Sequence, residues 1–167
     1  KQLNEKKIEA VYTETNQEIS DEEFRKVILS DEALAYGNPI DNKAQDSTYN
    51  IYKLSEIKRL YIPIDLYPVT DIKDISKLKN LEWLFISGDN EYKFSTIRDT
   101  NKEMKVAPDN MEEIKNLSNL YQLSIVHIDC SNVDTSQIFS RCSSAWLSDS
   151  KIDTMKNLEN AKNLESL

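Results

Sequence analysis

Apolar residues recur at every third position along much of the chain, and each run ends with a step of two. One run comprises Val69, Ile72, Ile75, Leu78, Leu81, Leu84 and Ile86, and a second comprises Pro108, Met111, Ile114, Leu117, Leu120, Leu123 and Ile125. An α-helix repeats its inward positions at about 3.6 residues and a strand at about 2. A sustained spacing of three therefore predicts 3₁₀-like turns or short extended steps. The final step of two predicts a short strand at the end of each run.

The runs themselves repeat along the sequence. The marker residues Leu123, Ala145 and Leu167 lie 22 positions apart, whereas Leu84 and Leu123 are separated by 39 positions, which is one period plus 17 residues. A period of this length predicts a solenoid, in which each unit buries its apolar face against the next one. We place the extra residues in an insertion at about 88–107.

A helix is predicted before the first run. Ser20 followed by Glu23 forms a capping box, in which the two side chains satisfy each other's backbone amides. Ile19 and Phe24 have the spacing of a hydrophobic staple, and a helix from about 21–35 follows. Such a helix would cover the open end of a solenoid, whose first apolar edge would otherwise face water.

The leucine pattern from Val69 to Ile86, with its copies in one register, resembles the leucine-rich repeat proteins. The closest type is the internalin-like 22-residue repeat of Gram-positive bacterial surface proteins, and the helix resembles their N-terminal cap. The resemblance covers about residues 19–167. It implies an α/β leucine-rich repeat solenoid with short parallel strands on the concave face, preceded by a small helical cap, and a secreted or cell-surface location. The chain then divides into a segment with the cap at 1–50 and repeats at 51–167.

One position departs from the family pattern. These repeats usually place an asparagine five residues after the first strand leucine, where its side chain bonds to the backbone of the turn. The corresponding residues here are Asp65, Asp89, Ile128 and Ser150. Aspartate and serine can supply part of that bonding, but Ile128 cannot, so the sequence leaves the turn after the Leu123 strand open.

The composition excludes several functions. The formal net charge is −8 and no basic run is present, which argues against nucleic-acid binding. No apolar stretch approaches the roughly 18 residues of a membrane span, so membrane insertion is not expected. With 2 glycines in 167 residues the chain has no phosphate-binding glycine loop. No cofactor and no metal are predicted.

Candidate binding residues are the middle residues of the predicted strands, which point away from the core. They are Tyr61, Phe85, Ser124 and Trp146, with Arg59, Trp83 and Gln122 at neighbouring outward positions. Aromatic side chains in a contiguous exposed patch are typical of recognition sites. Alternatively, the insertion folds back over these side chains, with Tyr92 and Phe94 as its anchors.

Catalysis has weak support in the sequence. His127 is the single histidine, and Asp129 or Asp134 is a conceivable partner for it in a catalytic arrangement. A histidine just after a strand is more often a surface or hydrogen-bonded structural residue. Cys130 and Cys142 have the spacing of neither a zinc site nor a redox motif and are interpreted as small buried apolar residues, with a disulfide as the alternative.

These observations favour a non-enzymatic extracellular module that binds a protein partner of unknown identity through its concave face. The alternative is a cell-wall glycan-binding or spacer domain, in which the same aromatic rings stack on sugars. A third interpretation is a targeting arm of a larger protein.

Overall fold

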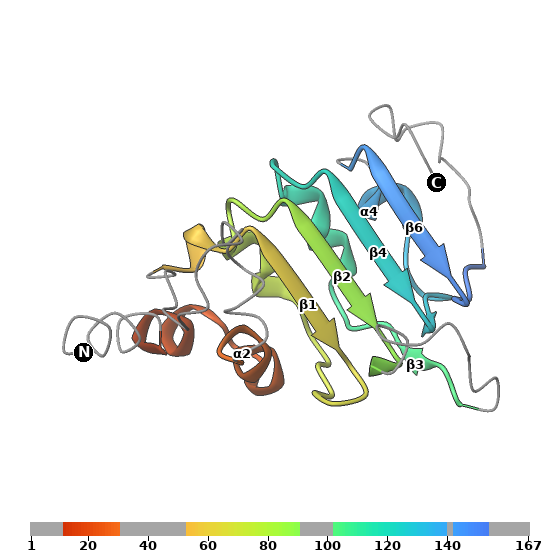
Figure 1. The fold of residues 1–167 in the computed structure, drawn as a ribbon, viewed down its shortest axis with the longest axis horizontal. Helices are drawn as coiled ribbons and strands as arrows, with labels where there is room; N and C mark the ends of the chain where they lie inside the picture. The colour runs from red at the N-terminus through yellow and green to blue at the C-terminus, as the bar shows by residue number, and fades with distance from the viewer. Residues whose placement is uncertain (1–11, 31–52, 91–101, 140–141, 154–167) are drawn as a thin grey trace, which may run out of the picture.

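Four parallel strands form a sheet in the computed structural model, which describes residues 12–30, 53–90, 102–139 and 142–153. The sheet order is β1-β2-β4-β6, so strands from successive repeats lie side by side (Figure 1). Their bounds are Arg59–Pro63 for β1, Trp83–Ser87 for β2, Gln122–Val126 for β4 and Ser144–Ser148 for β6. This is an α/β leucine-rich repeat fold, as the sequence predicts.

The strand register follows the leucine pattern. Leu60 pairs with Leu84, Leu84 with Leu123, and Leu123 with Ala145, so successive strands are 24, 39 and 22 residues apart. These four side chains are buried in one continuous core. In the following row Ile62, Ile86 and Ile125 are buried with them, and Leu147 packs against the core while only partly buried. The repeat markers read from the sequence are therefore the inward side chains of adjacent strands.

Short 3₁₀ helices precede the first three of these strands, as the period of three predicts, and those before β2 and β4 lie behind the sheet (Figure 1). They are η1 (Leu54–Glu56), η2 (Lys73–Lys77) and η4 (Met111–Asn116). The next coil instead makes an α-helical turn, α4 (Thr135–Ile138), which contacts η4. Asp134 begins this turn, because its carboxylate accepts hydrogen bonds from both the backbone amide and the hydroxyl of Ser136.

The end of the insertion forms a strand that the sequence pattern does not reveal. β3 (Lys105–Val106) pairs in parallel with β5 (Ile128–Asp129) in a second, two-stranded sheet. The Ala107 amide donates to the Asp129 carbonyl at 3.0 Å. Backbone hydrogen bonds to the next repeat therefore fix the returning part of the insertion.

The turn after β4, left open by the sequence, is held from the following repeat. Ile128 is buried in the core, and its backbone amide donates to the Ser150 hydroxyl at 3.2 Å. Ser150 in turn donates to the Ser148 carbonyl at 3.1 Å. A polar side chain one repeat later thus takes over the bonding that Ile128 cannot provide.

The helix α2 (Glu22–Ile28) begins one residue later than the capping box predicts. Its N-cap is Asp21, whose carboxylate accepts the Phe24 amide at 2.7 Å. Ser20 is not the cap, because its hydroxyl donates to Asp74 in the first full repeat at 2.6 Å. Helical geometry ends at Ile28, well before the predicted end near residue 35. Ser20 therefore joins the start of α2 to the segment that carries Asp74.

A second helix precedes α2, over residues 12–18. It leads into Ile19, which is buried together with Phe24 in the same core as the leucines. α2 also contacts β1, at the end of the sheet where no earlier strand is described. The two helices thus pack against the first repeat.

Within the described ranges, no helix combines the length and the apolarity that a passage through a bilayer requires.

Both cysteines are free and buried. Burial raises the pKa of the Cys130 thiol to about 12 and that of Cys142 to about 11. We expect neither thiol to react with iodoacetamide at about pH 8 while the protein is folded, because the thiolate is the nucleophile. Both should react in about 6 M guanidinium, which exposes them. Mass spectrometry counts the adducts, and rapid labelling of the native protein would contradict this burial.

Candidate functional site

The predicted binding residues lie in two parallel rows across the sheet. The register aligns Arg59, Trp83, Gln122 and Ser144 in one row, and Tyr61, Phe85, Ser124 and Trp146 in the next. Because side chains alternate along a strand, both rows point away from the buried leucine rows. We call the surface formed by these outward side chains the strand face. The fold therefore brings all seven candidate residues onto one surface.

Aromatic rings on the first two strands contact one another. The ring centroids of Tyr61 and Phe85 are 4.9 Å apart, and those of Trp83 and Phe85 are 5.8 Å apart in an edge-to-face arrangement. Such contacts restrict the rings, and Trp83 and Phe85 remain partly exposed. Phe85 thus connects the two rows and holds Trp83 in place.

Exposure differs sharply along the aromatic row. Trp146 is 61% exposed, whereas Tyr61 is 2% exposed and its hydroxyl donates to the Asn90 side chain at 3.4 Å. Ser124 is also buried, at 8%. Tyr61 and Ser124 are therefore not available as the sequence-based hypothesis expects. The proposed anchors Tyr92 and Phe94 lie outside the described residues.

The exposed part of the strand face lies toward the beginning of the strands and toward β6. The row at their far end is largely covered, since Pro63, Ser87 and Val126 are all buried. We define the open strand face as the residues of these two rows that remain at least partly exposed to solvent. They are Arg59, Trp83, Phe85, Gln122, Ser144 and Trp146.

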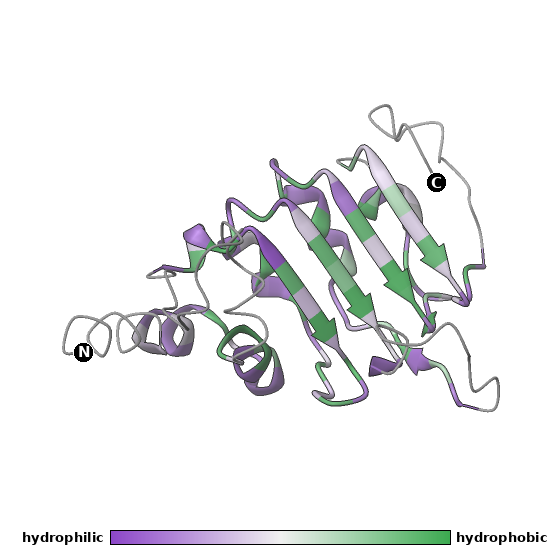
Figure 2. Cartoon of the chain, viewed as in Figure 1, coloured by the Kyte–Doolittle hydropathy of each residue, from purple (hydrophilic) through white to green (hydrophobic). Residues whose placement is uncertain are grey.

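No carboxylate lies among the outward residues of these four strands, although the chain contains 29 aspartates and glutamates. Figure 2 shows strongly hydrophilic residues in the sheet only where β1 and β4 begin, at Arg59 and Gln122. The open strand face is thus aromatic and neutral apart from one guanidinium, on an acidic protein.

His127 lies in the turn after β4, and its partner is neither Asp129 nor Asp134. Its Nδ1 is 2.9 Å from the Asp149 carboxylate, which comes from the equivalent turn one repeat later. Asp129 instead accepts the Ser131 hydroxyl and amide, which lower the pKa of its carboxyl group. The sequence contains a signal for the correct pair, because positions 127 and 149 differ by one period of 22.

A catalytic arrangement does not follow from this pair. The imidazole is buried, and no hydrogen-bond partner reaches its Nε2 among the described residues. A nucleophilic triad requires a hydroxyl or thiol at that nitrogen. The pair links two adjacent turns and is a structural feature of the repeat stack. Across all the residues that the structure describes, no three histidine, cysteine, aspartate or glutamate side chains are placed to hold a metal ion.

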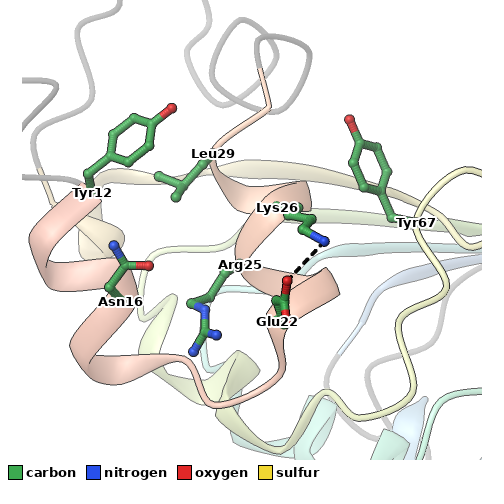
Figure 3. Close-up of a pocket in the computed structure, with 7 residues that line it drawn as sticks. All are labelled: Tyr12, Asn16, Glu22, Arg25, Lys26, Leu29 and Tyr67. Atoms are coloured by element: carbon green, nitrogen blue, oxygen red, sulfur yellow. Dashed lines mark ion pairs between the residues drawn. The ribbon is translucent and has the colours of Figure 1, made fainter.

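A depression of about 530 Å³ lies between the helix at 12–18, α2 and the loop after β1 (Figure 3). Its charged groups already have partners. Lys26 is 3.1 Å from Glu22, and Arg25 donates to the Ile19 carbonyl at 3.0 Å. Tyr12, Leu29 and Tyr67 supply the apolar part of the wall. Because its cations are satisfied internally, this depression is a weaker candidate than the open strand face.

No protein-family model matches the chain, and no curated protein matches it in sequence. Among solved structures it is similar to internalin C2 from Listeria monocytogenes, with 20% identity, a TM-score of 0.42, and coverage of 68% of this chain and 42% of that one. A second internalin of the same organism has 22% identity, a TM-score of 0.32, and coverage of 58% and 31%. The chain thus spans less than half the length of either internalin.

Proposed function

We propose that this protein is a non-enzymatic leucine-rich repeat module that binds a protein partner on the open strand face. The observation that carries the proposal is Trp146, which is 61% exposed on the same surface as the Trp83–Phe85 ring pair. An exposed patch of apolar side chains marks an interaction site on a soluble protein, and tryptophan is enriched among the residues that dominate binding energy.

The scaffold supports this role physically. Trp83, Phe85 and Trp146 extend from strands that are fixed by the buried leucine rows, so binding need not order a flexible loop first. Tyr61 on the neighbouring strand β1 is buried, and its ring packs against that of Phe85, so it supports Phe85 without contacting the partner itself. The aromatic rings offer rigid apolar contact area, and the side-chain amide of Gln122 can form hydrogen bonds. This combination is typical of surfaces that bind another protein.

We place the module outside the cell, as a secreted or surface-attached protein with internalin-like 22-residue repeats and an N-terminal helical cap. The helices at the start of the described chain support the cap, since they pack against the first repeat. The 22-residue step from Leu123 to Ala145 supports the repeat type. Detection of the protein in the culture medium or on intact cells by antibody labelling tests the location, and purely intracellular signal would contradict it.

Replacing Phe85 and Trp146 with alanine is expected to reduce affinity for a captured protein partner at least about 100-fold. Truncation of a central aromatic residue costs about 2 kcal/mol or more at such sites. The partner is purified after capture on the wild-type protein and titrated calorimetrically against both forms. Circular dichroism and thermal unfolding should show an intact fold, because neither ring belongs to the buried core and Trp146 is mainly solvent-exposed.

Val106→Ala is the matched control. Val106 is 68% exposed on β3, outside the strand face, so its truncation also removes exposed apolar area. We expect its affinity to equal that of the wild type. Equal affinity of the double variant would overturn the proposal. Binding to a glycan array without any protein partner would instead support the sugar-binding alternative.

A further inference from the structure

The guanidinium of Arg59 is the positive charge of the open strand face. Its side chain is exposed at the start of β1, and within the described residues no hydrogen bond or ion pair engages it. The neighbouring basic residue differs in this respect. Lys58 forms an ion pair with Glu82 at 2.8 Å. Arg59 is thus the one basic side chain of the strand face, and it is available to a ligand.

Acidic side chains near the ends of the strands are already engaged. Glu82 pairs with Lys58 before β2, Asp89 pairs with Lys102 at 2.8 Å after β2, and Asp149 meets His127 after β6. The strand face itself holds no carboxylate. A carboxylate brought by a partner would therefore meet Arg59 without a competing acid on this surface.

Apolar contact is available at a defined distance from Arg59. Within the aromatic row, Ser124 carries the one short side chain and lies between Phe85 on β2 and Trp146 on β6. Ser124 is itself nearly covered, at 8% exposed, so an apolar partner side chain at this position would contact the two flanking rings and not the serine. From β4 to β1 the sheet spans two strand spacings of about 4.8 Å, and Arg59 lies two residues nearer the strand start, about 6.6 Å away along the strand. The two points are thus about 12 Å apart, which an extended chain covers in three to four residues.

We infer that the open strand face takes an acidic protein segment. An aspartate or glutamate of this segment bonds to Arg59, and an aromatic or large aliphatic side chain three to four residues away lies over Ser124 between Phe85 and Trp146. This inference rests on the proposed function, and it adds the chemistry of the partner. The carboxylate and the guanidinium form a charge-assisted pair, while the rings supply the buried apolar area.

A displayed random peptide library tests the inference with the intact protein. Peptides are selected on the wild-type chain, and each enriched sequence is synthesised and titrated by fluorescence anisotropy against the wild type and against Arg59→Glu. We expect enrichment of an acidic residue three to four positions from an aromatic or leucine-type residue. Arg59→Glu should weaken these peptides at least about tenfold, because it places a carboxylate opposite a carboxylate.

Lys79→Glu is the charge-matched control. Lys79 is exposed in the turn before β2, outside the four strands, and its reversal changes the net charge by the same amount. Its affinity for the peptides should remain within about twofold of the wild type. Raising the salt concentration from about 50 to about 500 mM should weaken binding to the wild type and should have little effect on binding to Arg59→Glu.

The outcomes separate this inference from the proposed function. Selected peptides that lack the acidic residue, or that bind Arg59→Glu as well as the wild type, overturn the acidic partner. If those same peptides still lose binding to the Phe85→Ala and Trp146→Ala double variant, the proposed function stands. Peptides that bind the double variant as well as the wild type count against both the inference and the proposed function. Failure to enrich any peptide has the same meaning.

Discussion

Replacement of Gly88 by alanine is expected to lower the free energy of unfolding by about 3 kcal/mol, near the upper end for inserting one carbon into a packed site. Gly88 follows β2 and is buried against the turn after β4. A Cβ at this position would lie 2.2 Å from the His127 carbonyl oxygen. Real Cβ atoms do not approach an oxygen so closely, so one of the two turns has to move.

Neither turn can move without losing hydrogen bonds. The Gly88 amide donates to the Val126 carbonyl at 2.9 Å, and the His127 amide donates to the Ser148 carbonyl at 3.0 Å. His127 also has a positive φ of 55°, which is uncommon for a residue with a side chain. The clash would therefore spread through three adjacent repeats instead of relaxing locally.

Chemical denaturation with urea measures this effect, and a double variant identifies the clashing atom. The Ile128 Cδ1 is 3.2 Å from the same position, so a side chain also approaches it. Adding Ile128→Val to Gly88→Ala removes that methyl group and should not restore stability, because the backbone oxygen remains. Restoration by the double variant, or an unchanged midpoint for Gly88→Ala alone, would contradict the explanation.

Leu123→Ala is expected to destabilise the protein by about 3–5 kcal/mol, the range for a buried leucine whose cavity cannot collapse. Leu123 is fully buried on β4, between Leu84 and Ala145 in the register. Ala145 already has a small side chain, so no large neighbour on that side can fill the space. The strands on both sides are fixed by parallel backbone pairing.

Leu66→Ala provides the matched control for Leu123→Ala. It removes the same atoms from a side chain that is 54% exposed in the turn after β1. Its expected cost is within about 0.5 kcal/mol, as for most surface substitutions. Both variants are unfolded in urea and compared with the wild type at one temperature. Similar costs for the two leucines would mean that the three-residue pattern does not mark the core.

Much of this fold is predictable because solenoid packing is local. Leu81 and Leu120, which the period of three assigns to the core, are both buried, and the same spacing predicted η2 and η4. Each coil packs mainly against the next one, so a short stretch of sequence specifies most of the contacts that it makes. The outward positions of the strands followed from the same register.

The candidate site was predictable in position but not in exposure. Alternation along a strand placed Tyr61, Phe85 and Trp146 in one row, yet Tyr61 is buried and Trp146 is exposed. Periodicity states which way a side chain points and contains no information on what else covers that face. Asn90, beyond the end of β2, reaches the Tyr61 hydroxyl, a contact between repeats that residue spacing does not encode.

Capping shows a similar limit. Ser20 and Asp21 are both good N-cap residues, and the local sequence alone does not choose between them. The repeat supplies Asp74, whose carboxylate accepts the Ser20 hydroxyl and amide, so Asp21 caps α2 instead. A long-range hydrogen bond thus decides between two local alternatives of similar strength.

By itself, then, the sequence determined the repeat, the inward leucine rows and the set of side chains that share the strand face, because each depends on contacts one period apart. Only the tertiary structure decided which of those side chains remain open to solvent. It also brought β3 back onto β5. These features depend on where the turns and the insertion lie in space, and hydrogen bonds between distant backbone segments fix those positions independently of the apolar period.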